Sequence, residues 1–312
     1  MRLHNRMRRA RLIVDFHAHL EEIEGRAPTP EAFVAEMNNA GIDKAVIYGV
    51  DQASFGEGVN NAWASLLKGP TTKKKWLPVS KEMSAVVNRS DEAISSFCRN
   101  APERLIGFGS ISPDRFRPDL KLEWAVKQLG LRGVKIYPHS GFYPNDKRMD
   151  RVYQKCVDLG VPVVIHTGIK AIRMQWIKYN DPTYVDDVAT NFPDLDVVMS
   201  HGGYPWIEQF LAVAYSNPNI WVDITFLDYI EKTFAKDGLA EETIRRLADL
   251  VGTERILWGS EGPSLSLPLF GQHGAEHYQH SMDFLVKRFT FLSDQDKANI
   301  LGDNAARLLK LK

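Results

Sequence analysis

Eight short runs of apolar residues, separated by longer stretches with a helical pattern, constrain the fold of this chain more than any other feature. Val, Ile, Leu and aromatic residues dominate the runs, and most runs are nearly continuous in apolar residues. They occupy residues 12–16, 44–50, 105–110, 133–137, 162–167, 197–201, 220–224 and 256–260. Strands that are buried on both faces have this composition, and parallel sheets are buried on both faces. The runs therefore predict eight parallel strands.

The segments between the runs carry helix start and stop signals. Thr29 can cap a helix that begins at Pro30, and Gly41 ends it. Three further amphipathic stretches end directly before a glycine, at 119–129, 149–159 and 240–251. Strands that alternate with helices predict an α/β fold, a (β/α)8 TIM barrel that forms a single domain over residues 1–312. The alternative is an open doubly wound sheet, but no GxGxxG sequence follows the first strand.

Residues 1–11 contain five arginines and are predicted to be a solvated tail, because the cluster leads directly into the first strand. Two later segments, 52–84 and 264–280, interrupt the alternation of strands and helices. Residues 52–84 include three consecutive lysines and are predicted to form a long loop over the barrel mouth, with a solvated surface excursion as the alternative. The formal net charge of the 312 residues is zero, which argues against nucleic acid or an anionic membrane surface as a partner.

The sequence also carries signals about the cellular compartment. No apolar stretch reaches the roughly 20 residues that span a bilayer, and the tail lacks the apolar centre of a secretory signal. Cys98 and Cys156 form neither a CxxC metal motif nor a disulfide framework. These features predict a cytoplasmic protein that does not contact a membrane.

His17 and His19 follow the first apolar run with one residue between them. Residues two apart in a strand point to the same face, so the two imidazoles are predicted to project side by side from the strand end. Imidazole pairs of this kind are suited to bind a metal ion. A single histidine at such a position is more often a hydrogen-bonded core residue, but the pair favours the metal interpretation.

Polar side chains also stand at the ends of the later runs, where the chemistry of a (β/α)8 barrel is located. They are Lys135, His139, His166, His201, Asp223, Thr225 and Glu261. Four of the histidines and one acid at the same mouth predict a metal site with an open coordination position, namely His17, His19, His166, His201 and Glu261. For Lys135 three roles are open, namely carbamylation, pairing with a substrate carboxylate, or neutralisation of acids inside the barrel, and we favour the last two.

The remaining histidines are predicted to lie away from the metal. His139 follows the fourth strand in a loop and is expected to contact substrate. His273 and His277 have the i, i+4 spacing of a helical metal pair, but the segment 264–280 is loop-like, and we expect a solvated surface there.

The strand-end motifs resemble those of the amidohydrolase-related branch of the amidohydrolase superfamily. Members of that branch include aminocarboxymuconate-semialdehyde decarboxylase, γ-resorcylate decarboxylase and several lactonases. The resemblance covers nearly the whole chain and is carried by VDFHAH (14–19), GVKIYP (133–138), VIHTG (164–168), FPD (192–194), SHGG (200–203), ILWGSEGP (256–263) and ILGDNAARLL (300–309). It implies a small-molecule substrate, one divalent metal ion and a homodimer.

The resemblance also implies roles for individual residues. His17, His19 and His166 correspond to metal ligands, and His201 corresponds to the catalytic histidine beside the metal. Glu261 stands where the family has an aspartate, so we expect it to be a metal ligand and a catalytic base. The alternatives are that Glu261 acts as a base alone, or that the site binds metal weakly. The ion is expected to be Zn²⁺, with Mn²⁺ and Fe²⁺ as alternatives. From their position near the barrel mouth, and not from the resemblance, the residues expected to bind substrate are Lys135, Tyr137, His139, Tyr204 and Trp206, with packing at the barrel rim as the alternative for the aromatic ones.

Two reactions suit these residues. The first is hydrolysis of a lactone, ester or amide in a small, flat substrate, in which Glu261 takes a proton from metal-activated water and His201 polarises the carbonyl or protonates the leaving group. The alternative is non-oxidative decarboxylation of an aromatic or unsaturated acid, in which His201 and Glu261 deliver a proton to the ring carbon. The Thr167-Gly168 and Gly202-Gly203 pairs resemble those of hydrolase-like members of the family more than those of its decarboxylases, and this resemblance favours the hydrolase. A non-catalytic or redox-active relative of the fold is a third class.

Overall fold

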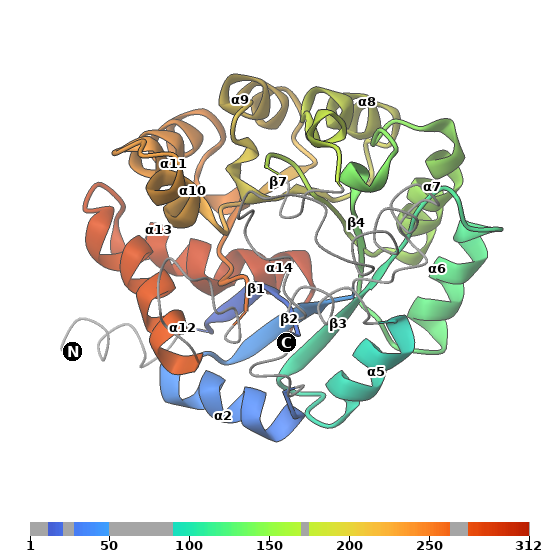
Figure 1. Ribbon diagram of the computed structural model, residues 1–312, viewed down its shortest axis with the longest axis horizontal. Helices are drawn as coiled ribbons and strands as arrows, with labels where there is room; N and C mark the ends of the chain where they lie inside the picture. Colours follow the sequence, from blue (N-terminus) through green and yellow to red (C-terminus); the bar gives the residue numbers. More distant parts are fainter. Residues whose placement is uncertain (1–11, 21–27, 50–89, 170–174, 263–273, 312) are drawn as a thin grey trace, which may run out of the picture.

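In the computed structural model, the eight predicted strands form one parallel sheet that closes into a barrel (Figure 1). The structure describes residues 12–20, 28–49, 90–169, 175–262 and 274–311, so the tail 1–11, the loop 52–84 and His273 lie outside it. The strands are β1 (Val14–Ala18), β2 (Lys44–Tyr48), β3 (Leu105–Ser110), β4 (Val134–Ile136), β5 (Val163–Ile165), β6 (Val197–Met199), β7 (Ile220–Asp223) and β8 (Ile256–Leu257). Each strand pairs with the next along the chain. The (β/α)8 prediction is confirmed.

Backbone hydrogen bonds close the ring between β1 and the segment that follows β8. Phe16 N donates to Trp258 O at 3.0 Å, and Glu261 N donates to His17 O at 2.8 Å. An isolated parallel bridge joins Ala18 to Glu261. The ring closure therefore ties His17 directly to Glu261.

β8 is shorter than the predicted run 256–260, because the residues of the run that follow Leu257 form hydrogen bonds with segments other than β7. Trp258 N donates to Ile300 O at 3.1 Å, and Ser260 N donates to the Asp15 carboxylate at 2.9 Å. The chain thus leaves the regular strand early and turns towards the barrel mouth.

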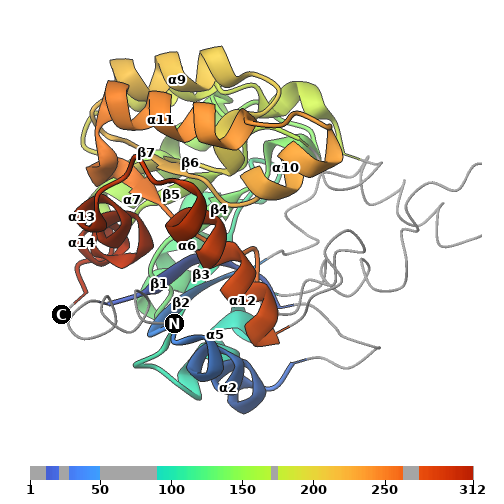
Figure 2. The same cartoon turned by 90° about the vertical axis from the view of Figure 1, so that its left-hand side faces the viewer.

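Helices surround the ring of strands, with α9 and α11 on one side and α2 and α5 on the opposite side (Figures 1 and 2). The helices are α2 (Pro30–Ala40), α5 (Asp91–Arg99), α6 (Pro118–Lys127), α7 (Asp150–Leu159), α8 (Thr183–Asn191), α9 (Ile207–Ser216), α10 (Leu227–Thr233), α11 (Leu239–Val251), α12 (Gly274–Asp283), α13 (Asp294–Ala298) and α14 (Asn304–Leu308). In the described part of the chain, no helix is both long and apolar enough to cross a membrane.

The predicted helix signals act as expected in α2. The Thr29 hydroxyl accepts a hydrogen bond from Ala32 N at 3.2 Å, and Pro30 occupies the first helical position. Gly41 ends the helix with φ 77°, a left-handed conformation that glycine adopts without a steric penalty.

Two apolar layers stabilise the barrel. The larger layer lies between the strands and the outer helices. The smaller layer fills the barrel interior with alternate strand residues and is continued by side chains of the C-terminal segment that includes α14. Its members include Val14, Phe16, Tyr48, Phe108, Val164, Val198, Leu257, Ala305 and Leu308. This layer fills the interior of the barrel below the carboxyl ends of the strands.

Candidate active site

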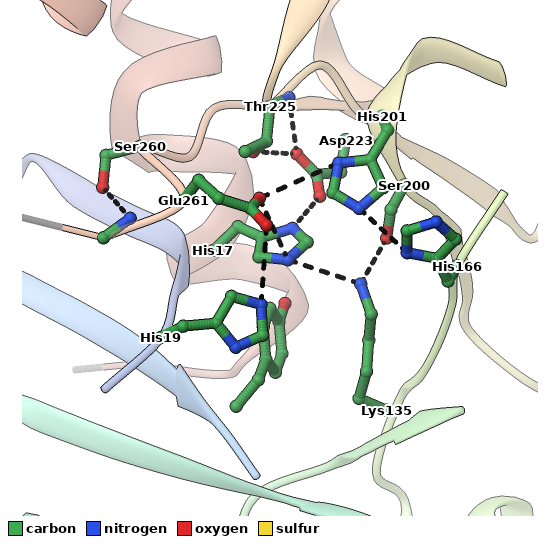
Figure 3. Close-up of polar contacts among 12 residues, drawn as sticks. His17, His19, Lys135, His166, Ser200, His201, Asp223, Thr225, Ser260 and Glu261 are labelled. Carbon is green, nitrogen blue, oxygen red and sulfur yellow. Dashed lines mark hydrogen bonds and ion pairs between the residues drawn. The ribbon is translucent and has the colours of Figure 1, made fainter. Parts of the chain in front are cut away.

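A group of polar and charged side chains converges at the carboxyl ends of the strands (Figure 3). They belong to β1, β4 and β7 and to the residues that follow β1, β5, β6, β7 and β8. The group consists of His17, His19, Lys135, His166, Ser200, His201, Asp223, Thr225 and Glu261. Active sites of (β/α)8 barrels are located at this end.

A register shift in β1 directs the His17 side chain into the barrel. β1 pairs regularly with β2 up to Asp15, and the register shifts between Asp15 and Ala18. Irregularities of this kind re-aim side chains and are frequent next to active sites. The His17 ring is fully buried and lies 5.3 Å from the ring of His19. Gly259 leaves room for it, because a Cβ there would approach His17 Cβ to 2.4 Å.

Each ring nitrogen of His17 faces a charged residue. Nδ1 lies 2.5 Å from Asp223 Oδ2, and Nε2 lies 3.4 Å from Lys135 Nζ and 3.6 Å from Glu261 Oε2. The backbone N and the hydroxyl of Thr225 donate to the second Asp223 oxygen, which fixes the carboxylate. Asp223 therefore accepts the Nδ1 proton, and the lone pair on Nε2 is directed into the site.

Glu261 faces three imidazoles from a strained backbone position. Its φ is 70°, a left-handed conformation that residues other than glycine rarely adopt. Its carboxylate oxygens lie 3.6 Å from His17 Nε2, 3.7 Å from His19 Nε2 and 3.9 Å from His201 Nδ1. These separations exceed hydrogen-bond lengths. They are close to the roughly 3.4 Å that separates two ligands of a tetrahedral ion with bonds of about 2.1 Å.

His201 and His166 form a relay that directs a second lone pair into the site. His166 Nε2 lies 2.7 Å from Ile169 O, so it carries the proton, and His166 Nδ1 accepts from His201 Nε2 at 3.2 Å. His201 Nδ1 is therefore unprotonated. It has no hydrogen-bond partner among the described residues, and it faces Glu261.

Burial keeps these imidazoles neutral. It is the largest cause that lowers the pKa of His19 and of His166 to about 3, and the Lys135 charge lowers both further. Burial likewise lowers the pKa of His17 and of His201 well below the usual value. Neutral imidazole is the form that binds a metal or accepts a proton.

Lys135 places a cation inside the barrel. Its side chain is fully buried, and Nζ donates to Ser200 Oγ at 2.7 Å and lies 4.9 Å from the centre of the Tyr48 ring. Burial lowers the pKa of Lys135 to about 8, although the Asp223 and Glu261 charges act in the opposite direction. An ammonium group in this position can pair with an anionic part of a substrate.

The Asp15 carboxylate holds the two ends of the ring closure together. It accepts from Ser260 Oγ at 2.6 Å, from Ser260 N at 2.9 Å and from His17 N at 3.1 Å. Burial raises the pKa of Asp15 to about 7, although these hydrogen bonds lower it. Asp15 thereby fixes the turn that carries Glu261 relative to the strand that carries His17.

A divalent cation fits this arrangement. One ligand atom each of His17, His201 and Glu261 lies within 4.8 Å of the other two. Imidazole lone pairs that face a carboxylate repel it, and a cation between them replaces this repulsion with attraction. Imidazole nitrogen and carboxylate oxygen are donors that zinc and manganese accept. His19 borders the same space, whereas His166 lies behind His201.

Two predicted substrate-binding residues lie beside the histidines. The ring centre of His139 is 4.3 Å from that of His166, and the ring centre of Tyr137 is 5.7 Å from that of His139. The Tyr137 hydroxyl donates to Gly49 O at 3.0 Å, which fixes its ring at the end of β2. The rings of His166, His139 and Tyr137 thus form a continuous row beside the site.

The other two predicted substrate-binding residues lie in the segment between β6 and α9. Tyr204 and Trp206 are half-buried and follow His201 by three and five residues. The ring centre of Tyr204 is 4.8 Å from that of Phe234, at the end of α10.

The prediction of a solvated loop over 264–280 is wrong for its second half. A helix begins at Gly274, and His277 on this helix is buried with Nε2 2.7 Å from Ser260 O. His277 therefore supports the turn that precedes Glu261. His280, one turn later, lies 3.5 Å from Asp228, which raises the pKa of His280. The glycines and proline before the helix obscured its short amphipathic pattern.

Sequence reasoning placed Asp223 at the end of its strand but assigned it no function, and it overlooked Asp15. A signal was present in both cases, because each acid stands within a run of apolar residues. A carboxylate in a buried strand needs specific partners. His17 and Ser260 supply them here.

Comparison with known proteins places the chain in a family. The sequence profile described as amidohydrolase matches residues 14–311. Protein fluG of Emericella nidulans is 25% identical over 103 residues, which are 32% of this chain and 11% of that protein. This match thus spans about a tenth of the length of that curated relative.

Solved structures show the same fold at low sequence identity. A probable 2-pyrone-4,6-dicarboxylic acid hydrolase from Acinetobacter baumannii, with citric acid bound, has a TM-score of 0.64 and 16% identity and covers 96% of this chain and 99% of its own. A 5-carboxyvanillate decarboxylase from Novosphingobium aromaticivorans, in complex with manganese and 4-hydroxy-3-methoxy-5-nitrobenzoic acid, has a TM-score of 0.61 and 14% identity. The second comparison covers 97% of each chain.

Proposed function

Because this chain belongs to the amidohydrolase family, we propose that it is a metal-dependent hydrolase that cleaves a lactone, ester or amide bond in a small, flat substrate. One observation carries the proposal, namely that unprotonated nitrogens of buried imidazoles converge on the Glu261 carboxylate at 3.6–3.9 Å. Protein sites with such donors bind a divalent ion and keep one position open for water or substrate.

We assign His17, His19, His166 and Glu261 as ligands of one divalent ion, Zn²⁺ with Mn²⁺ and Fe²⁺ as alternatives. When bound, such an ion lowers the pKa of a water ligand to about 7 and polarises a carbonyl oxygen. His201 competes with His166 for the fourth place, because His201 Nδ1 lies 3.9 Å from Glu261 Oε2, whereas the two ring nitrogens of His166 face Ile169 O and His201 Nε2. The metal content of His166→Ala and of His201→Ala separates these ligand sets.

The side chains of the protein then supply proton transfer and orientation. The Glu261 carboxylate accepts a proton from the attacking water, and His201, whose unprotonated Nδ1 faces Glu261, receives this proton and passes it to the leaving group. The Lys135 ammonium pairs with a negative oxygen of the substrate. Tyr137, His139, Tyr204 and Trp206 are proposed to border the substrate.

Decarboxylation of an aromatic or unsaturated acid is the second candidate, and the buried Lys135 cation favours it. Nζ lies 3.4 Å from His17 Nε2, where it would pair with a substrate carboxylate. In this reaction His201 and Glu261 would have to deliver a proton to carbon. We rank hydrolysis first, because the Thr167-Gly168 and Gly202-Gly203 pairs resemble the hydrolase-like members of the family more than its decarboxylases.

Isotope labelling distinguishes the two reactions. Zinc- or manganese-loaded protein would be incubated in H₂¹⁸O with dihydrocoumarin, phenyl acetate and a series of hydroxybenzoates. We expect acid release with one ¹⁸O atom incorporated per product carboxylate, and no such release by His201→Ala. Stoichiometric release of carbon dioxide, with no ¹⁸O in the organic product, would overturn the hydrolase proposal in favour of the decarboxylase.

A further inference from the structure

Three consecutive strands end in a non-glycine residue with a left-handed backbone. They are His201 after β6 (φ 64°), Phe226 after β7 (φ 79°) and Glu261 after β8 (φ 70°). A bulky side chain in this region is a steric outlier, and such residues cluster at active sites and ligand-binding sites. His201 and Glu261 belong to the candidate active site, and Phe226 is the third residue with this backbone conformation at the same end of the barrel.

The neighbours of Phe226 explain why its backbone adopts this conformation. Thr225 is buried, and both its backbone N and its hydroxyl bond to Asp223. Leu227 is fully buried and fills the space beside Gly202, where a Cβ would approach Leu227 Cδ2 to 2.5 Å. Phe226 is thus held between two anchored residues, while its own side chain is only half-buried.

This conformation places the Phe226 ring against the site. Its centre lies 5.9 Å from that of the His201 ring, with the rings at 68° in an edge arrangement. The Tyr229 ring of α10 also packs against Phe226, with the ring centres 4.4 Å apart and the rings at 35°. Thr225 and His201 lie at neighbouring strand ends on the same side of Glu261 (Figure 3). A half-exposed aromatic surface therefore adjoins the imidazole that we assign to catalysis.

We propose that Phe226 is a specificity-determining residue that forms an aromatic wall beside His201 and selects planar ring acids and their esters over saturated ones. The inference rests on one part of the proposed function, namely that the substrate binds beside His201. Aromatic pairs favour edge-to-face or offset stacking. A flat ring can contact Phe226 in this way, whereas a puckered ring of equal size and charge cannot.

Binding of two product-like acids tests this directly. Benzoate and cyclohexanecarboxylate have the same charge and nearly the same size, and they differ in planarity. Calorimetric titration of the zinc-loaded protein should give about fivefold tighter binding of benzoate, which corresponds to about 1 kcal/mol. The ratio should fall to about one in Phe226→Leu. It should stay at the wild-type value in Tyr215→Leu, which alters an exposed aromatic residue at the end of α9.

A second variant separates this role from a role in packing. Glycine adopts φ 79° without a steric penalty, so Phe226→Gly should melt no lower than Phe226→Leu and should also lose the benzoate preference. The inference is overturned if Phe226→Leu keeps the wild-type ratio, or if the wild type binds neither acid. If the ratio depends on Phe226 but no substrate is hydrolysed, the aromatic wall stands and the proposed reaction fails.

Discussion

Replacing Asp223 with asparagine tests how the His17 imidazole is held, because the change keeps the shape of the side chain and removes its charge. In the wild type, one Asp223 oxygen accepts from His17 Nδ1 at 2.5 Å. The other accepts from the backbone N and the hydroxyl of Thr225. Asparagine has a single acceptor oxygen and cannot serve both sides.

Both orientations of the new amide are unfavourable. If its oxygen faces His17, its NH₂ group meets the Thr225 donors in a fully buried site. If its NH₂ group faces His17, it donates to Nδ1, and the ring proton moves to Nε2, where it blocks the lone pair directed at Glu261. Such outer partners of metal-binding histidines contribute 10- to 100-fold to metal affinity. We expect Asp223→Asn to weaken Zn²⁺ binding about 30-fold, or about 2 kcal/mol.

Competition with a zinc-sensitive fluorescent chelator at pH 7.5 measures this affinity. Asp196→Asn is the matched control, since Asp196 Oδ1 accepts from Trp221 Nε1 at 2.9 Å at the opposite end of β6. The control should bind zinc like the wild type. If Asp223→Asn also binds zinc like the wild type, the argument that Asp223 sets the His17 tautomer is refuted.

Three further predictions concern metal loading, pH and stability. His17→Ala should lose most bound metal, whereas His201→Ala should keep its metal and lose turnover. Elemental analysis measures the bound metal and an activity assay measures turnover. Full turnover by His201→Ala would contradict the catalytic role of His201. In the metal-free protein, folding depresses the pKa of His19 to about 3, so the unfolded chain binds one more proton between about pH 6 and 4. The stability that this group contributes is present above its unfolded pKa of about 6.5 and is lost as pH falls. Urea unfolding should therefore show that the free energy of unfolding of His19→Asn falls less steeply with pH than that of the wild type, by about 1.4 kcal/mol per pH unit. Asn304 is fully buried and donates to Thr253 O and Ile256 O, both at 2.7 Å, so Asn304→Ala should lower the free energy of unfolding by about 3 kcal/mol without changing zinc affinity.

The sequence predicted the barrel because its evidence is local and repeated. Each strand of a closed parallel sheet is buried on both faces, so each appears as a short apolar run, and the run 105–110 coincides with β3. The strand-end histidines could be located for the same reason, since every strand of such a barrel ends at the same mouth.

The details of the site depend on contacts between distant segments, which a local pattern cannot reveal. The register shift in β1 arises where Glu261 N bonds to His17 O, two residues 244 positions apart in sequence. The tautomer of His17 depends on Asp223, and the tautomer of His201 depends on the His166–Ile169 contact. The burial of His277 follows from its bond to Ser260 O. Each of these features becomes visible only after the chain has closed into a ring.

Anomalous scattering from crystals soaked in zinc, recorded on both sides of the zinc absorption edge, shows whether the cluster around His17 and Glu261 binds a metal ion. We predict one strong peak per chain, about 2.1 Å from His17 Nε2 and within bonding distance of the Glu261 carboxylate. A peak elsewhere, or none at full zinc saturation, would contradict the assignment of this cluster as a metal centre.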